Sequence, residues 1–197
     1  AQETALTNTS DVLYRIKELS TQAANDTLSK ADRQSVAVEL GALREQIMSL
    51  GNSQDSNGNY LFSGSKASTP PYAKDATGAV YYQGDQARMK VNVGDSRRMN
   101  LNMPGSDAFV RVVRDDGKGA QTGVDFFQAL DDLVTAVKNS DYSNIQRGIS
   151  EVDGLQQGVS EGLAQIGTDL TVVDMQNSVL DEVVLRLKAT RSDVEDL

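Results

Sequence analysis

Residues 155–187 read LQQGVSEGLAQIGTDLTVVDMQNSVLDEVVLRL. Apolar side chains recur here at alternating intervals of four and three residues, and the alternation continues on both sides, from Ile145 to Val194. This spacing places them on one face of a coiled-coil-like helix. We expect a single helix of about 50 residues, or about 75 Å. Helices of compact domains average about 11 residues, so this length is typical of a rod. We assign to the rod seam of this helix the residues Ile166, Leu170, Val173, Leu180, Val184 and Leu187.

Three glycines lie four residues apart within this pattern, at Gly154, Gly158 and Gly162. Each costs about 1 kcal/mol relative to Ala in a helix. One interpretation is a weak or broken helix, and the other is a smooth stripe that lets another helix approach closely. The apolar spacing keeps its register through the glycines, which favours the unbroken helix.

Upstream of the long helix, residues 124–142 read VDFFQALDDLVTAVKNSDY and predict a shorter amphipathic helix that ends at Asn139. The first 50 residues show the same kind of pattern in two parts. The second part has a rod seam of Val36, Leu40, Leu43, Ile47 and Leu50, with charged residues expected off it at Arg33, Glu39, Arg44 and Glu45. The inner face of the first part comprises Leu6, Leu13, Ile16, Ser20 and Ala23.

The segment between these two parts, NDTLSKADRQ at 25–34, offers Asn25, Asp26 and Ser29 as end and cap residues. Two antiparallel helices and one interrupted helix both fit this pattern.

The middle of the chain changes to a period of two. RMKVNVG at 88–94 and RRMNLNM at 97–103 alternate in polarity, with Met89, Val91 and Val93 on one face, and predict an antiparallel hairpin. Pro104-Gly105 predicts a type II turn. We expect a third strand in FVRVV at 109–113 and a flexible exit in DDGKGAQTGV at 115–124. Tyr81 and Tyr82 are neighbours on a strand, so we expect one in the core and one exposed.

Residues 57–72, NGNYLFSGSKASTPPY, connect the helical pattern to this middle part. No converging polar groups indicate a ligand loop, and we interpret the stretch as a structural joint. The aromatic-aliphatic triplet should anchor the chain, the glycines supply backbone freedom, and the proline pair stiffens the exit. The predicted joint residues are Tyr60, Leu61, Phe62, Gly64, Pro70, Pro71, Tyr72 and Gly84.

These patterns predict an α+β fold with an elongated antiparallel helical rod and coiled-coil-like packing. Residues 1–58 and 124–197 form the rod, and residues 59–123 form a small antiparallel β subdomain inserted between its halves. The patterns leave open whether this β part is compact or lies along the rod.

The composition excludes several kinds of function. The chain of 197 residues has no Cys and no His, which removes disulfides, thiolate metal sites and the commonest general base. No spacing fits an oxygen-ligand metal loop, so we expect neither metal nor cofactor. A net charge of −9 argues against a nucleic-acid partner, and no apolar run approaches the ~20 residues that cross a bilayer. Residues 57–123 differ from the rest: they hold nine Lys or Arg and six Asp but no Glu.

RIKELSTQAANDTLSKADRQSVAVELGALREQI at 15–47 resembles the first rod helices of bacterial flagellins, through R-x-x-E-L at 15–19, QAAN at 22–25 and Glu39-Leu40. NYLFSG at 59–64, followed by YYQGD at 81–85, resembles the hook-associated branch of the flagellin family, whose members join hook to filament. The resemblance runs from Asp11 to Leu197. It implies the flagellin D1-like rod architecture, and a core fragment from which both terminal segments are missing.

The resemblance also implies a structural, non-enzymatic role in a ring layer of subunits at the base of the flagellar filament. The implied partners are neighbouring copies of the chain, another hook-associated protein on the hook side, flagellin on the filament side, and an export chaperone bound through a missing C-terminal segment. Neither nucleic acid nor a membrane is an implied partner. The implied location is extracellular, after export through the flagellar type III apparatus.

Two alternatives remain. One is a divergent filament flagellin with the same rod. The other is a cell-wall glycan hydrolase, which would need paired carboxylates in a cleft; acidic residues such as Asp115 and Asp116 instead fall in turns or on helix exteriors.

Overall fold

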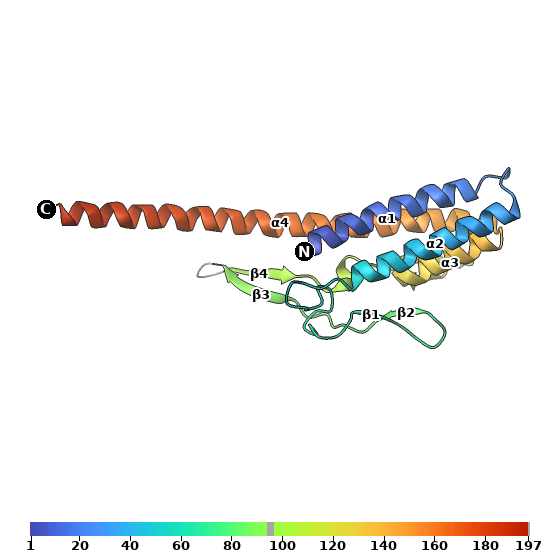
Figure 1. The fold of residues 1–197 in the computed structure, drawn as a ribbon, viewed down its shortest axis with the longest axis horizontal. Helices are drawn as coiled ribbons and strands as arrows, with labels where there is room; N and C mark the ends of the chain where they lie inside the picture. Colours follow the sequence, from blue (N-terminus) through green and yellow to red (C-terminus); the bar gives the residue numbers. More distant parts are fainter. Residues whose placement is uncertain (94–96, 197) are drawn as a thin grey trace.

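The computed structural model describes residues 1–93 and 97–196, and for residues 89–93, 97–101 and Val173 the backbone alone. Four helices and three pairs of strands follow one another along the chain (Figure 1). The helices are α1 (Gln2–Ala23), α2 (Lys30–Gly51), α3 (Phe126–Lys138) and α4 (Tyr142–Glu195). The strands are β1 (Tyr72–Lys74), β2 (Val80–Tyr82), β3 (Met89–Val93), β4 (Arg97–Asn102), β5 (Val112–Asp115) and β6 (Gln121–Val124), with a short 3₁₀ helix at Gly105–Asp107.

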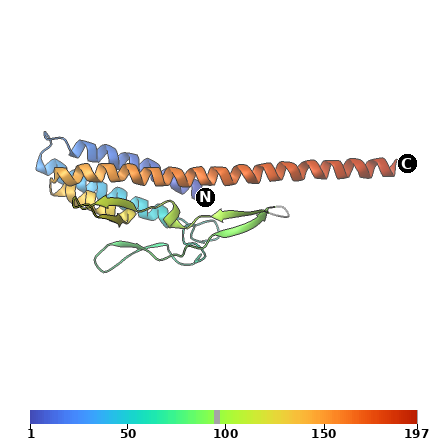
Figure 2. The ribbon, with the colours of Figure 1, turned by 180° about the vertical axis from the view of Figure 1, so that it is seen from behind.

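The four helices pack side by side at one end of the molecule, and α4 projects far beyond the other three (Figures 1 and 2). α1 runs antiparallel to α4, so that Lys17 Nζ lies 2.5 Å from Asp153 Oδ1 while Leu6 lies beside Gly162. The core of this bundle is made of fully buried side chains from every helix. They include Leu6, Leu13, Ile16, Leu40, Ile47, Leu130, Leu133, Ile145 and Leu155.

α1 and α2 are two separate antiparallel helices. Ser29 is the N-cap of α2 and forms a capping box with Asp32. The expectation that Arg33 lies off the packed face is wrong, because its side chain is buried. Its Nε donates to Ala23 O at 2.9 Å, which satisfies an orphan carbonyl at the end of α1, and its Nη2 donates to Asn25 O at 2.8 Å in the following loop. Arg33 also contacts the Tyr142 hydroxyl at the start of α4.

Arg44 was also expected off the packed face, and it too is buried. Its Nη2 donates to Asp131 Oδ2 at 2.9 Å, and the carboxylate on α3 compensates the buried charge. The arginine therefore ties α2 to α3.

α4 is one unbroken helix of 54 residues, so the broken-helix interpretation is wrong. Most of the glycine stripe faces the segment that leads into β5, and only Gly162 also approaches another helix, through Leu6 of α1, which corrects the other interpretation in part. Gly158 faces the Val110 side chain, and a Cβ added at Gly162 would lie 3.2 Å from the Ala108 Cβ. The missing side chains therefore let the chain leading into β5 cross α4 at short range.

The middle of the chain forms three separate two-stranded antiparallel sheets, β1–β2, β3–β4 and β5–β6. The predicted hairpin at 88–103 is confirmed in β3–β4, whereas its predicted side-chain faces lie outside the described residues. Two expectations are wrong. The strand expected at 109–113 begins only at Val112, and it pairs with β6, which was expected to be a flexible exit. Gly117 and Gly119 have φ of +74° and +90°, which lets the chain reverse direction between β5 and β6.

Pro104-Gly105 does not form the expected type II turn, which would need a positive φ at Gly105. Instead Pro104 is the N-cap of the 3₁₀ helix, and the Gly105 amide donates to Phe62 O at 2.8 Å. This bond fastens the 3₁₀ helix to the predicted joint.

Candidate functional site: the joint between helices and hairpins

The joint is built on a cluster of buried aromatic rings. Phe62 meets Phe109 with ring centroids 5.4 Å apart, and Phe109 meets Phe126 at 5.2 Å. Tyr72 lies 5.3 Å from Phe109 and 5.1 Å from Phe127. Edge-to-face and tilted aromatic pairs of this kind contribute about 0.5–1.5 kcal/mol each beyond area burial. Because the rings come from four separate segments, the aromatic cluster holds the hairpin region against the start of α3.

The Tyr82 hydroxyl lies within hydrogen-bonding distance of two backbone carbonyls of the joint. Its oxygen lies 2.6 Å from Asp85 O and 3.0 Å from Phe62 O, and its single proton can be donated to either. Burial raises the pKa of Tyr82 to about 12. Burial also holds the pKa of Tyr72 well above its usual value. Both hydroxyls are therefore kept neutral by their surroundings.

Two glycines of the joint are required by its geometry. Gly64 has a φ of +69°, which favours glycine. A Cβ at Gly84 would lie 2.5 Å from the Tyr82 hydroxyl oxygen, so a side chain there would displace the hydrogen-bonding group.

The other predicted joint residues divide by burial. Leu61, Phe62, Pro71 and Tyr72 are buried, whereas Tyr60 and Pro70 are half-buried. The carbonyls of the two prolines accept hydrogen bonds from Gln83, from its side chain at 2.7 Å and its backbone at 2.8 Å.

Two polar residues of the joint were missed by the sequence reasoning. Gln2 is buried, and its Nε2 donates to Leu61 O at 2.7 Å and Met103 O at 2.9 Å. Asn52, directly after α2, exchanges two hydrogen bonds of 2.9 Å with the backbone of Tyr72. The position of Asn52 directly after a predicted helix could have indicated that its side chain bonds to nearby backbone. Gln2 offered none, because its partners lie 59 and 101 residues away.

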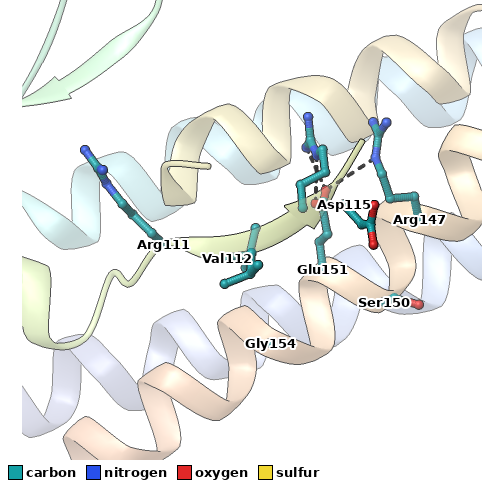
Figure 3. A pocket seen from close by; sticks show the side chains of 9 residues that line it. Arg111, Val112, Asp115, Arg147, Ser150, Glu151 and Gly154 are labelled. Carbon is teal, nitrogen blue, oxygen red and sulfur yellow. Dashed lines mark hydrogen bonds and ion pairs between the residues drawn. The ribbon is translucent and has the colours of Figure 1, made fainter. Parts of the chain in front are cut away.

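A second contact fastens β5 to the helices through charge (Figure 3). Arg114 Nη2 lies 2.7 Å from Glu151 Oε1 of α4, and Arg147 Nε lies 3.6 Å from the same oxygen. Arg114 Nη1 lies 2.7 Å from Asp132 Oδ2 of α3. These carboxylates raise the pKa of Arg114, the hydrogen bond to Glu151 being the largest cause. Beside them is an open pocket of about 450 Å³, and Arg111 points away from the ion pairs. These arginines and carboxylates pair with one another, and the ion pairs hold the β5–β6 hairpin in place against α3 and α4.

The residues of the rod seam fall into three groups. Leu40 and Ile47 are buried, and Leu43, Leu50 and Ile166 are partly buried against the core. The side chain of Val173 lies outside the described residues. Leu170, Leu180, Val184 and Leu187 are exposed, because α4 extends past the other helices. We call residues 167–195 the free half of α4.

In the part of the chain that the structure describes, no helix is both long and apolar enough to cross a membrane. The same residues contain no group of three or more acidic side chains placed to hold a metal ion.

Comparison with known proteins shows which proteins this chain resembles in sequence and in fold. The profile of the bacterial flagellin N-terminal helical region matches residues 1–67. The whole chain aligns with flagellar hook-associated protein 3 of Salmonella typhimurium at 27% identity, covering 65% of that protein's length. A structure of Xanthomonas campestris FlgL superposes with a TM-score of 0.86 at 24% identity, over 98% of this chain and 92% of that one. A putative flagellar hook-associated protein from Vibrio parahaemolyticus gives 0.84 at 25% identity, over 98% and 83%.

The chain matches the bacterial flagellin family in its N-terminal helical region, over residues 1–67. It is similar over its full length to flagellar hook-associated protein 3. The helical fold with small two-stranded sheets between the helical segments is the FlgL fold. The chain spans less than two thirds of the length of the curated hook-associated proteins that it matches.

Proposed function

We propose that this chain is the core of a structural protein that joins the hook of a bacterial flagellum to its filament. The observation that carries the proposal is the full-length alignment with hook-associated protein 3 of Salmonella typhimurium and of Escherichia coli K12, at 27% and 26% identity. In this proposal, copies of the chain form a ring layer between the hook and the filament.

The joint and the ion pairs at β5 support a mechanical role. Buried aromatic rings and charged pairs hold the hairpins to the helical bundle from two sides. A subunit of this kind passes load between its helices and its hairpins without a flexible linker. We propose that residues 1–58 and 124–197 are the rod domain and that residues 59–123 are the inserted domain that faces neighbouring subunits.

The proposed partners are neighbouring copies, another hook-associated protein on the hook side and flagellin on the filament side. An export chaperone bound through a further C-terminal segment completes the set. The proposed location is the extracellular flagellum, reached through its type III export apparatus. The exposed rod seam residues, Leu170, Leu180, Val184 and Leu187, are the proposed contacts of the rod during assembly.

The test is complementation in a strain of the source bacterium that lacks the gene for this protein. The complete gene should restore swimming and attached filaments, and immunogold labelling should give a narrow band at the base of each filament. Label along the whole filament would identify a filament flagellin and overturn the proposal. Cleavage of peptidoglycan by the purified protein, abolished by a single Asp or Glu substitution, would overturn it in favour of a hydrolase.

A further inference from the structure

Three exposed loops of the hairpin region share one geometry, and in each an Asp carboxylate closes the loop. They are DSNGN at 55–59, DATGA at 75–79 and DGKGA at 116–120. In each loop Oδ1 of the Asp accepts the amides two and four residues later, at 2.7–3.1 Å. The Asp amide donates to the carbonyl four residues later at 2.9–3.0 Å, and the Gly three residues later has a φ between +80° and +90°.

Within residues 57–123, which contain no Glu, Asp75 and Asp116 have this geometry. A carboxylate on a single methylene reaches the backbone of its own turn, and this is the reason that Asp favours such turns. Asp85 and Asp115 accept backbone amides two residues ahead in the same way. The longer side chain of Glu does not fit these positions.

The loops differ in the residue before the Gly, which is Asn57, Thr77 or Lys118. Asn57 is the only Asn in the sequence that is followed by Gly, and both residues are exposed. A following Gly has no Cβ to block approach of its amide nitrogen to the Asn side chain. Of the three loops, this is the one whose side chain can react with its own backbone.

We propose that Asn57-Gly58 is a site of spontaneous deamidation, and that the Asp55 carboxylate keeps the loop in the conformation that opposes the reaction. The Gly58 nitrogen loses its proton to a base in solution and attacks Cγ of Asn57. The bond from Cγ to the side-chain nitrogen breaks, ammonia leaves, and a five-membered succinimide forms. Water then opens the ring at either carbonyl and leaves Asp or isoaspartate, so the net change consumes one water and releases one ammonia.

The closed loop opposes the attack because its nitrogen nucleophile is engaged. The Gly58 amide donates to Asp55 O at 3.0 Å, and the Asn57 amide is held by Asp55 Oδ1 at 2.8 Å. The loop must open before Gly58 N can reach Cγ of its neighbour. Removal of the Asp55 carboxylate should therefore speed the reaction.

Deamidation would in turn destabilise the loop. A new carboxylate at position 57 lies two residues from Asp55 and repels it. Isoaspartate lengthens the backbone by one methylene, which breaks the match between the Asp55 amide and the Asn59 carbonyl. The next residue along, Tyr60, pairs with Gln54 and donates to Ala67 O at 2.8 Å at the entrance to the joint. The modification thus loosens the chain where it enters the joint.

The test follows the 197-residue chain during storage in mildly alkaline buffer, by peptide mass spectrometry and by labelling with an isoaspartate-specific methyltransferase. We expect Asn57 to lose its amide ahead of every other Asn and to yield isoaspartate. Asp55→Ala should raise that rate several-fold. The matched variant Asp75→Ala opens the equivalent loop of β1–β2 and should leave the rate at Asn57 unchanged. Far-UV circular dichroism confirms that each variant keeps its helices.

A second variant tests whether the loop geometry, rather than the sequence of one loop, sets the reaction. Thr77→Asn places Asn before Gly78 in the same geometry, and we expect a second site there, accelerated by Asp75→Ala. Loss of amide at Asn57 no faster than at the other Asn residues would overturn the proposal. An unchanged rate in Asp55→Ala would overturn the protective role of the carboxylate.

Discussion

Between Tyr142 and Leu163, α4 packs its apolar side chains against α1 and α3. Beyond Ile166 the apolar side chains keep the same spacing of four and three, but here the helix projects past the others (Figure 1). Val152, Leu155 and Val159 are buried in the first part. In the free half, Leu180 and Leu187 are 59% and 65% exposed. The period of a sequence therefore predicts a helix and its apolar face, but not what covers that face. In the free half, the covering partner is not among the described residues of this chain.

If the packed end supplies the stability of the molecule, the joint should show the largest effect. Phe62→Ala removes a fully buried ring that contacts Phe109, and we expect a loss of about 3–5 kcal/mol in the free energy of unfolding, measured in urea. The control is Tyr81→Ala, at a half-exposed position on β2, which should cost far less. A loss below about 1 kcal/mol for Phe62→Ala, typical of surface positions, would contradict the role of the joint.

A matched pair of leucines compares the two parts of α4 directly. Leu155→Ala, in the packed part, should cost about 2–5 kcal/mol. Leu187→Ala, in the free half, should change the free energy of unfolding by no more than about 0.5 kcal/mol. Urea melts followed at 222 nm measure both. Equal losses would mean that the free half is packed in solution.

The sequence predicted the helices well because their signals are local. The length of α4, the C-cap of α3 at Asn139 and the N-cap of α2 at Ser29 follow from spacing and cap chemistry within a few residues. β5 and β6 were placed wrongly because their pairing depends on Gly117 and Gly119 adopting positive φ. Glycine-rich polar segments carry no alternation that separates a tight hairpin from a flexible loop.

The joint was predictable in part. Leu61, Phe62 and Tyr72 could be placed in it because apolar residues next to a helix end need a core to bury them. Arg33, Arg44 and Gln2 could not, since a buried polar side chain is distinguished from a solvated one only by distant partners. Long-range contacts of this kind leave no periodic trace in the sequence.

Two glycines of α4 should respond in opposite directions to the same substitution. A Cβ at Gly158 would collide with the Val110 side chain, and we expect Gly158→Ala to cost about 1–3 kcal/mol from overpacking. The gain of about 1 kcal/mol in helix propensity offsets only the low end of this cost. Gly167 faces open space, so Gly167→Ala keeps that gain locally and should raise the helical signal in circular dichroism. Stabilisation by both substitutions would show that the segment before β5 does not press on α4.

The smallest effect should come from titration of the joint in alkali. The neutral Tyr82 hydroxyl is favoured by burial, so its pKa is about 12 in the folded chain against an ordinary value of 10.0. A raised pKa of an acid means that its stabilising contribution is complete below pH 10 and is lost as the pH rises toward 12. Tyr72 and Tyr82 should therefore ionise above the ordinary pKa of tyrosine in a spectrophotometric titration near 295 nm. Tyr82→Phe should remove one of these two groups from the titration while leaving the helical signal of α4 unchanged, because the free half projects beyond the packed helices (Figure 1). Ionisation of Tyr72 and Tyr82 at the ordinary pKa of tyrosine would mean that solvent reaches the aromatic cluster. The packed end would then be as open to water as the free half, and the comparison between the two would not hold.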